Sequence, residues 1–518
     1  MTAPKGRLLP LNTAQARNLR NFTAEELPLW RLTILTEVTS RLTPDRARAV
    51  LVTIVARHEA LRSRLAVGPS GCPMQEVLPA RAAESVMRWH LVVENAFDSA
   101  DKRFWEEAEI DPWLHAFHAT AYVVDNAVAA VKVTVSHVFA DRIGIQVIEN
   151  ELYAVFARRA PSAPDPRQAS SYALTGTDPK VAQNTAFWRE VLSEAPRSCT
   201  YAPVRRDEME TVHGVEIQLP DDLLRQVEKA ASSLRTTPSC IWTAAVSILA
   251  EGLSGQHRQV FKTWTANRTT PQDFTAVVHL AQVVFMPLLG NPDDTLRARV
   301  DLATEVSFEM FERGTYDASA ILDHFNTGSG FGGMFFHPAF EWHYIPTMHH
   351  VRCTPGAAPR IFEEQARPRL SSAMSDLQVS LSYEPGPILQ VRARRPISEE
   401  RSPESLLVDL IRTVELICRS PDVPTQRAGI SALPSRADLV PGHHSGAEIS
   451  LSFIKALVLA VPGIVECYVK IDDTDGQLLA ELELAAGYDP TTVKAEIRSV
   501  LVQAHGTAVP DAYLFSFA

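Results

Sequence analysis

The strongest constraint on the fold is a hairpin pattern that ends in a histidine and then changes to helical spacing. Two runs, "ATAYVV" and "AVAAVKVTVSH", flank Asp125-Asn126, a pair able to adopt the positive φ angles of a tight turn. Alternate residues of the second run share one face of the predicted strand: Val131, Val133, Val135 and His137. After Gly144 the apolar residues recur at helical spacing. We therefore expect a strand, a loop and a helix to meet at "SHVFADRIG", the kind of junction that often carries functional side chains on a rigid base.

The length predicts more than one domain, because 518 residues exceed what one compact core accommodates. Two stretches rich in Pro, Ser and Ala, residues 160–179 and 420–446, lack a hydrophobic period and indicate connections. They divide the chain into a first lobe (1–165), a second lobe (180–425) and a short C-terminal region (447–518). Strands mixed with helices in both lobes predict an α/β or α+β fold.

Local signals place the main elements of both lobes. "TPDRARAVLVTIVARHEALRSRL" predicts one helix that Thr43 caps, with His58 on its core-facing stripe. In the second lobe, helices are predicted for "PDDLLRQVEKAASSLRTT", "PSCIWTAAVSILAEGLSG" and "SPESLLVDLIRTVELICRS". "RQVFKTWTA" and "VVHLAQVVFMPLL" predict strands, and "SDLQVSLSYEPGPILQVRARRP" predicts a hairpin.

Composition excludes several classes of protein. The net charge of −11 and the pI near 5.8 argue against nucleic-acid binding, which needs a clustered basic surface. No run of apolar residues is long enough for a membrane span, and the N-terminus lacks the apolar core of a signal peptide. Six cysteines without paired spacing are typical of reduced thiols. We expect a cytoplasmic protein.

Motifs for metals and nucleotides are missing. The segment "FFHPAFEWHYIPTMHHVRC" holds four histidines and a cysteine, but their spacing matches no compact zinc pattern, so no metal is predicted. Its Trp342 and Tyr344 are candidates for lining a substrate pocket. No phosphate-binding or dinucleotide-binding glycine motif occurs between a strand and a helix, so no nucleotide cofactor is expected.

Six segments, in order and at suitable spacing over about the first 425 residues, resemble the condensation domain of nonribosomal peptide synthetases. They are "LPLNTAQARNLR", "RHEALRSRL", "VSHVFADRIG", "ANRTTPQDFTAVVHLAQVVFMPL", "GTYDASAILDHF" and "SDLQVSLSYEPG". The resemblance implies the chloramphenicol acetyltransferase-like fold, with two lobes in a V around a central tunnel. It also implies that phosphopantetheine arms of carrier proteins deliver a thioester donor to an amine or hydroxyl acceptor.

The motif "VSHVFADRIG" carries the implied site. His137 matches the second histidine of the family motif and is the predicted catalytic residue, as base or as positioner of the nucleophile. Imidazole suits either role, because its ordinary pKa lies near neutrality. Asp141 matches the motif aspartate, which supports the structure by pairing with an arginine. Two positions depart from the motif: Ser136 replaces the first histidine and Arg142 replaces the glycine, with Gly144 following in the same tunnel segment.

Arg142 allows two interpretations. Its guanidinium can contact an anionic substrate or the phosphopantetheine phosphate, or it can block one channel. The leading hypothesis is a stand-alone acyltransferase that forms an amide or ester bond in natural-product, secondary-metabolite or antibiotic biosynthesis. The alternative is an inactive condensation-like scaffold that recruits carrier proteins or tailoring enzymes.

The C-terminal region predicts a helix, a strand, a turn at Asp475-Gly476, a second strand, a helix and a final strand. It resembles the small C-terminal subdomain of adenylation enzymes, but it stops before their catalytic-lysine segment. We expect a relic or a docking module rather than adenylation activity. The chain has no carrier-type attachment serine, so we expect no cofactor of its own and an acyl or peptidyl carrier protein acting in trans.

Overall fold

The structure is a computed structural model. It describes residues 6–21, 24, 26–98, 109–157, 165–174, 178–194, 204–205, 210–321, 340–347, 358–366, 375–384, 386–433, 439–441, 448–472, 476–502, 504–505 and 509–517. The chain forms two compact units. Unit 1 comprises residues 1–183, 265–282 and 315–319, and unit 2 comprises residues 184–264, 283–314 and 320–518. After the chain first enters unit 2, it therefore returns to unit 1 twice.

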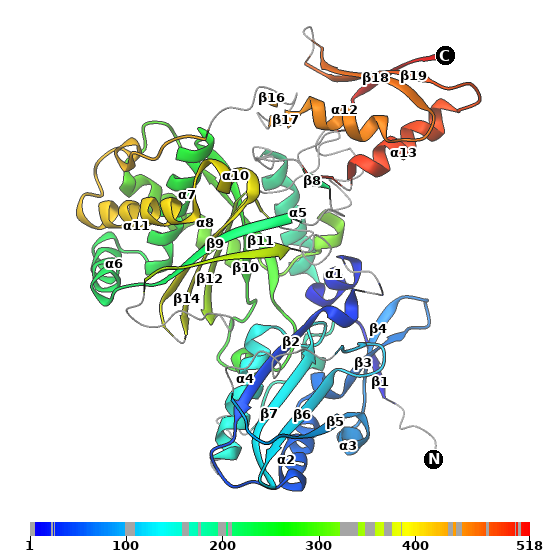
Figure 1. The fold of residues 1–518 in the computed structure, drawn as a ribbon, viewed down its shortest axis with the longest axis vertical. Helices are drawn as coiled ribbons and strands as arrows, with labels where there is room; N and C mark the ends of the chain where they lie inside the picture. Colours follow the sequence, from blue (N-terminus) through cyan, green and yellow to red (C-terminus); the bar gives the residue numbers. More distant parts are fainter. Residues whose placement is uncertain are drawn as a thin grey trace. The chain divides into compact units, whose positions relative to one another are not determined.

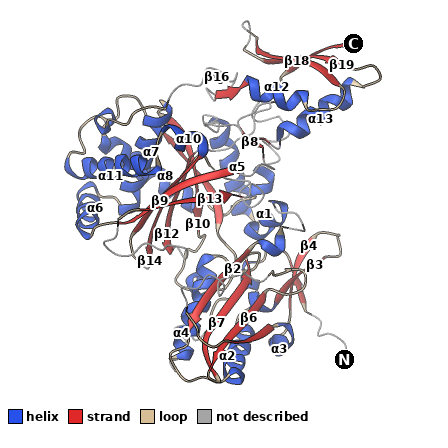
Figure 2. Cartoon of the chain, viewed as in Figure 1, coloured by secondary structure: helices blue, strands red, loops and turns tan. Residues whose placement is uncertain are grey.

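A four-stranded sheet forms the centre of unit 1 (Figures 1 and 2). Its strands are β2 (Arg31–Glu37), β5 (Arg88–Val93), β6 (Phe117–Val124) and β7 (Ala127–Ser136), in the order β2-β7-β6-β5. β7 is antiparallel to β2 and β6, and β5 is parallel to β6. Asp125 and Asn126 have φ angles of 51° and 61°, which confirms the predicted tight turn between β6 and β7.

One face of this sheet is covered by helices α2 (Pro44–Arg57) and α4 (Arg142–Phe156). The fully buried valines of β7 pack there with Leu51 of α2 and Ile148 of α4 in one hydrophobic core. Thr43 caps α2 as predicted, since its hydroxyl accepts a hydrogen bond from the Arg46 amide at 3.4 Å. His58 is buried, and its Nε2 lies 3.0 Å from Glu151 Oε2.

The predicted helix from Thr43 to Leu65 is too long. The α-helix ends at Arg57, a 3-10 turn follows at residues 59–62, and strand β3 begins at Ser63. His58 has an extended backbone, with φ −108° and ψ 117°. The ring of His58 thereby reaches Glu151, and Leu65 contributes to the strand pairing of β3 with β4 instead of to a helix.

Smaller elements complete unit 1. They are β1 (Arg7–Leu9), α1 (Thr13–Asn21), β3 (Ser63–Val67), β4 (Pro73–Val77) and α3 (Ala83–Val86), with β1, β4 and β3 forming a three-stranded sheet. The returning segment 276–280 also belongs to unit 1, because Val277 and Val278 are buried in the same core as β7. Residues distant in sequence therefore share one core.

Unit 2 is built on a seven-stranded mixed sheet in the order β11-β10-β12-β14-β15-β9-β13. The strands are β9 (Glu210–Gln218), β10 (Arg258–Thr265), β11 (Gln282–Leu289), β12 (Phe340–Thr347), β13 (Arg360–Ala366), β14 (Leu377–Glu384) and β15 (Ile388–Arg394). β10, β12 and β14 run parallel, whereas β14, β15, β9 and β13 pair antiparallel. The β14–β15 hairpin is the predicted one, although Pro385 lies outside the described residues.

Helices pack on this sheet and on each other: α6 (Asp221–Leu234), α7 (Pro238–Ser254), α8 (Leu296–Glu312), α10 (Arg395–Glu400) and α11 (Pro403–Arg419). α7 is buried almost all round and ends at Gly255, whose φ of 73° suits glycine. Ser402 caps α11. The predicted helices α6, α7 and α11 are thus confirmed. In α5 (Pro179–Glu194), the buried Trp188 packs edge-on against Phe285 of β11.

The predicted strand "VVHLAQVVFMPLL" begins five residues late. β11 starts at Gln282, and residues 277–281 form no regular strand. These residues do not pair with a neighbouring strand, because the backbone amides of Leu280 and Ala281 donate to the Asp141 carboxylate instead.

The C-terminal region has the predicted order of elements. The predicted elements are α12 (Leu451–Leu459), β18 (Ile464–Ile471), β19 (Leu478–Leu484), α13 (Pro490–Val502) and β21 (Ala512–Phe517). Two short strands that were not predicted, β17 (Glu448–Ser450) and β20 (Ala504–His505), occur in addition. β18 and β19 form an antiparallel hairpin, and β21 lies parallel to β19. Gly476 of the predicted turn has a φ of 70°, whereas Asp475 lies outside the described residues. Short pairs join β16 (Leu439–Pro441) to β17 and β8 (Val204–Arg205) to β20.

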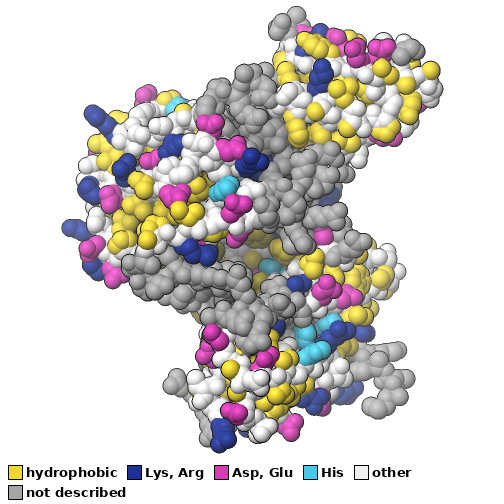
Figure 3. Space-filling model, in the orientation of Figure 1, with side chains coloured by type: hydrophobic (Ala, Val, Ile, Leu, Met, Phe, Trp, Pro, Cys, Tyr) yellow, Lys and Arg dark blue, Asp and Glu magenta, His cyan; other side chains and the backbone are white. Residues whose placement is uncertain are grey.

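Hydrophobic side chains reach the surface of this region, where yellow atoms are visible in Figure 3. Val465, Tyr468, Leu514 and Phe517 are each more than half exposed. Among the described residues, no helix combines the length and hydrophobicity that a bilayer-spanning segment needs.

We expect Asn126→Val to destabilise unit 1 by about 1–2 kcal/mol, because a β-branched residue tolerates the left-handed backbone at this turn poorly. Asn126→Gly keeps that conformation accessible and should match or exceed the wild type. Denaturant midpoints of the three proteins check this expectation. Equal midpoints for Val and Gly would contradict the turn geometry.

Candidate active site

Asp141 connects three parts of unit 1 through one buried carboxylate. Its Oδ1 caps α4 by accepting from the Gly144 amide at 2.9 Å, and it also accepts from Arg268 Nη2 at 2.7 Å. Its Oδ2 accepts from the amides of Leu280 and Ala281 at 2.9 and 3.1 Å. Burial alone would raise the pKa of Asp141, but Arg268, the neighbouring His279 and these amides outweigh it and hold the pKa below its usual value. Asp141 is therefore an anion with a structural task.

Arg268 is the buried cation of this pair, with its side chain fully covered. Besides Asp141, its guanidinium donates to the backbone carbonyls of Asp273, Ala276 and Val278 at 2.6, 3.3 and 3.1 Å. The arginine predicted to pair with Asp141 is thus identified as Arg268, in the "ANRTTPQD" segment. It fixes the path of the returning chain before β11.

His137 follows β7 directly and lies between two rings. Its imidazole stacks on Trp30 with a centroid distance of 4.7 Å and an interplanar angle of 10°. Its Nδ1 lies 3.1 Å from Nδ1 of His279, and the two rings meet edge to face. The His137 amide donates to the Trp30 carbonyl at 2.9 Å. His137 is partly exposed, and the carbonyls of His137 and Ala140 also interact with its ring. Among the described residues, Nδ1 is the ring nitrogen with a side-chain partner. Nε2 is thus the nitrogen left for a ligand.

The environment keeps the His137 ring neutral. Burial lowers its pKa, the Asp141 carboxylate opposes this, and Arg142 lowers the pKa further. The pKa of His279 is lowered to about 3 by burial and by the adjacent His137. Two imidazoles in contact cannot both carry a positive charge at low cost.

Sequence reasoning missed His279. It is almost fully buried, its Nε2 lies 3.0 Å from Asn18 Nδ2, and its carbonyl accepts from Asn12 Nδ2 at 2.9 Å. The available signal was a single histidine inside the apolar run "AVVHLAQVV", eleven residues after Arg268. The pattern of that run predicts a strand, and strand spacing alone does not single out the histidine.

The two variant motif residues occupy different positions. Ser136 is the last residue of β7 and is fully buried, and its hydroxyl accepts from the Val138 amide at 3.4 Å. Arg142 is the first residue of α4 and is partly buried. Gly144 lies against the returning chain, because a Cβ atom there would sit 3.2 Å from the Val278 nitrogen. The structure thus brings Ser136, His137, Asp141 and Gly144 together with Arg268 and His279.

Trp342 and Tyr344 lie in unit 2, on β12. Trp342 is buried, and its indole donates to the Thr243 hydroxyl of α7 at 2.8 Å. Tyr344 is exposed and packs against Tyr383 with a centroid distance of 5.2 Å. Between them, His343 contacts Glu341 and Gln378 through its two ring nitrogens, at 2.8 and 3.1 Å. The other histidines of this segment lie outside the described residues.

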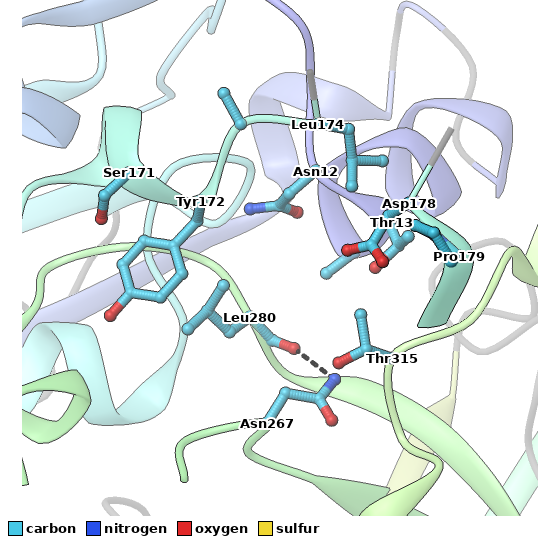
Figure 4. Close-up of a pocket in the computed structure, with 12 residues that line it drawn as sticks. Asn12, Thr13, Ser171, Tyr172, Leu174, Asp178, Pro179, Asn267, Leu280 and Thr315 are labelled. Carbon is cyan, nitrogen blue, oxygen red and sulfur yellow. Dashed lines mark hydrogen bonds between the residues drawn. The ribbon is translucent and has the colours of Figure 1, made fainter. Parts of the chain in front are cut away.

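A pocket of about 410 Å³ opens in unit 1 near the returning chain (Figure 4). Its polar lining includes Asn12, Thr13, Asp178, Asn267 and Thr315, none of which was a predicted site residue. Asn267, which has a φ of 50°, donates from Nδ2 to the Leu280 carbonyl at 3.0 Å. Leu280, which lines this pocket, directly follows His279 in the sequence.

The chain matches known proteins in family and in fold. The model of the condensation-domain family matches residues 6–340. No curated protein sequence matches the chain. The condensation domain of the monacolin K polyketide synthase MokA is similar, with a TM-score of 0.62 at 13% identity, covering 82% of this chain and 100% of that one.

Two further solved structures are similar. One is the condensation domain for chain release from the enacyloxin polyketide synthase, with a TM-score of 0.59 at 15% identity and coverage of 85% and 86%. The other is holo-AB3403, a four-domain nonribosomal peptide synthetase, with a TM-score of 0.63 at 12% identity and coverage of 82% of this chain and 34% of that one. These likenesses confirm the expected chloramphenicol acetyltransferase-like fold.

We expect Arg268→Met to destabilise the protein by on the order of 3–5 kcal/mol, because it leaves the Asp141 charge buried without its cation. Arg297→Met is the control, since its pair with Asp422 is exposed at the surface. Denaturant midpoints test the contrast. Similar shifts for the two variants would show that the buried Asp141–Arg268 pair contributes no more to stability than the exposed pair.

We also expect His279 to make stability depend on pH. Its folded pKa of about 3 lies below the ordinary histidine value, so the unfolded chain binds more protons in between. Stability therefore falls as the pH decreases from about 6.5 toward 4, by up to about 1.4 kcal/mol per pH unit.

His279→Gln should flatten this dependence, whatever its effect at neutral pH. Denaturant midpoints over the same pH range provide the measurement. The buried His115 and the partly buried His118, whose pKa values are also lowered to about 4, contribute equally to both proteins. An unchanged slope in the variant would rule out the buried neutral state of His279.

Proposed function

Because the chain belongs to the condensation-domain family of nonribosomal peptide synthetases, we propose that it is an acyltransferase that forms an amide or ester bond from a carrier-bound thioester. The acceptor nitrogen or oxygen attacks the thioester carbonyl. The new C–N or C–O bond forms, the C–S bond breaks, and the acceptor proton ends on the released phosphopantetheine thiol. The donor is held by a carrier protein acting in trans, and the chain contributes no cofactor of its own.

The observation that carries the proposal is the setting of His137. Trp30 and His279 hold the imidazole from two sides, and Nδ1 is occupied. Nε2 remains to contact the acceptor or the thioester. The lowered pKa of His137 favours the neutral ring near pH 7, which can accept or donate one hydrogen bond at Nε2.

Other residues support this assignment. In the proposal, Asp141 and Arg268 are structural, since they fix the loop after β7 against the returning chain. Arg142 contacts an anionic group, either on the acceptor or on the phosphopantetheine arm, from the first turn of α4. Trp342 and Tyr344 remain candidates for substrate contact, and the exposed Tyr344 is the better placed of the two.

The alternative function is a scaffold that binds carrier proteins or tailoring enzymes without catalysis. The observation in its favour is Arg142, which places a long cation where the family motif has glycine. The C-terminal region, with its exposed apolar residues, is compatible with a docking task in either case.

We expect His137→Ala to lower acyl transfer by about 10²-fold or more, the usual loss when an acid–base or positioning group is removed. The probe is a carrier protein loaded with an acyl group through phosphopantetheine and offered with a panel of amines and alcohols. Mass spectrometry detects the product. His90→Ala, an exposed histidine on β5, is the control and should keep the wild-type rate.

Full turnover by His137→Ala would refute the proposed role of this residue. Absence of turnover by the wild type, together with saturable binding of the loaded carrier, would favour the scaffold instead. Binding is measured by titration calorimetry with the same carrier.

A further inference from the structure

In unit 1, the side chains of Asn18, His279 and His137 contact one another in series, and the series ends at Nδ1 of His137. Asn18 of α1 lies 3.0 Å from His279 Nε2, and His279 Nδ1 lies 3.1 Å from His137 Nδ1. Asn18 and His279 are each only 1% exposed, so water does not compete for their hydrogen bonds. The contacts come from α1, from the chain before β11 and from the end of β7. This series links a neutral amide to the proposed catalytic ring.

The Asn18 amide determines which nitrogen of each imidazole ring carries the proton. An amide nitrogen donates hydrogen bonds and does not accept them, so Asn18 Nδ2 requires a lone pair on His279 Nε2. A neutral imidazole has one N–H, which in His279 must then be at Nδ1. That N–H can donate to Nδ1 of His137 across the 3.1 Å contact. The single proton of His137 is consequently at Nε2.

The neutral state of both rings is a condition for this sequence of donors. Burial lowers the pKa of each ring, to about 3 in His279. Among the charged groups, Asp141 raises the pKa of both rings, Arg142 lowers that of His137, and Arg17 lowers that of His279. The carbonyls of His137 itself and of Ala140 also interact with the His137 ring, and that of Ala140 interacts with the His279 ring, so these carbonyls compete with the contact between the rings for the ring protons.

We propose that Asn18 and His279 are positioning residues that set the tautomer of His137, so that His137 presents an Nε2–H donor to the substrate. That His137 contacts a substrate rests on the proposed function, whereas the tautomer of His137 does not. In this state His137 donates a hydrogen bond to a lone pair of the acceptor or of the thioester oxygen. It orients the reactants and does not begin the reaction as a free base.

The test reads the protonation of each ring nitrogen by NMR on protein labelled with ¹⁵N-histidine, at neutral pH and without substrate. His137→Gln and His279→Gln assign the two rings. In the wild type we expect His137 to be protonated at Nε2 and His279 at Nδ1. His279→Leu removes the donor, and the carbonyls of His137 and Ala140 are then the remaining partners of the ring, so His137 should shift to protonation at Nδ1.

Asn18→Leu should weaken the selection and give a mixture of tautomers in both rings. Thr13→Val is the matched control, because Thr13 is another buried polar residue of α1 whose hydroxyl contacts Gln282 instead of the histidines. It should leave the signals of both rings as in the wild type.

Protonation of His137 at Nδ1 in the wild type would overturn the proposal, and so would an unchanged tautomer in His279→Leu or the same shift in Thr13→Val. The readout needs no turnover. A protein that keeps the expected tautomer but fails to transfer acyl groups would contradict the proposed function and leave this inference standing.

Discussion

The pairing of Asp141 with Arg268 is the interaction on which the rest of the site depends. Neither charge is exposed to water, so the pair is stable only because other donors and acceptors complete its shell. The carboxylate accepts from one amide of α4 and two amides of the returning chain, and the guanidinium donates to three carbonyls of that chain. One ion pair thus sets the distance between the end of β7 and the segment before β11.

This arrangement also explains how a buried anion coexists with two neutral imidazoles. An uncompensated carboxylate nearby would favour protonation of His137 and His279. The Asp141 charge is instead offset by Arg268 and by backbone amides, so its influence on the rings is reduced. Desolvation then dominates, and both rings have lowered pKa values. The same contacts that hold the loop therefore determine the protonation state of the site.

Local chemistry made much of the fold predictable. The Asp125-Asn126 turn, the Thr43 cap and the order of elements in the C-terminal region follow from propensities that act over a few residues. The helix end at Arg57 did not follow, because it depends on the distant partner Glu151 of His58. Within the site, motif spacing identified His137 and Asp141. His279 remained hidden, because its importance arises from a contact across 142 residues of sequence.

The double return of the chain to unit 1 has a consequence for dissecting this protein. Residues 1–183 hold the hairpin, α2 and α4, yet Arg268 and His279 are supplied by a segment that follows β10 of unit 2. A fragment ending near residue 183 would contain Asp141 without its cation and His137 without its neighbouring ring. The two units are compact bodies in space but are not separable genetic modules. Any chimera that exchanges one of them must carry residues 265–282 with unit 1, even though they are encoded within the other unit.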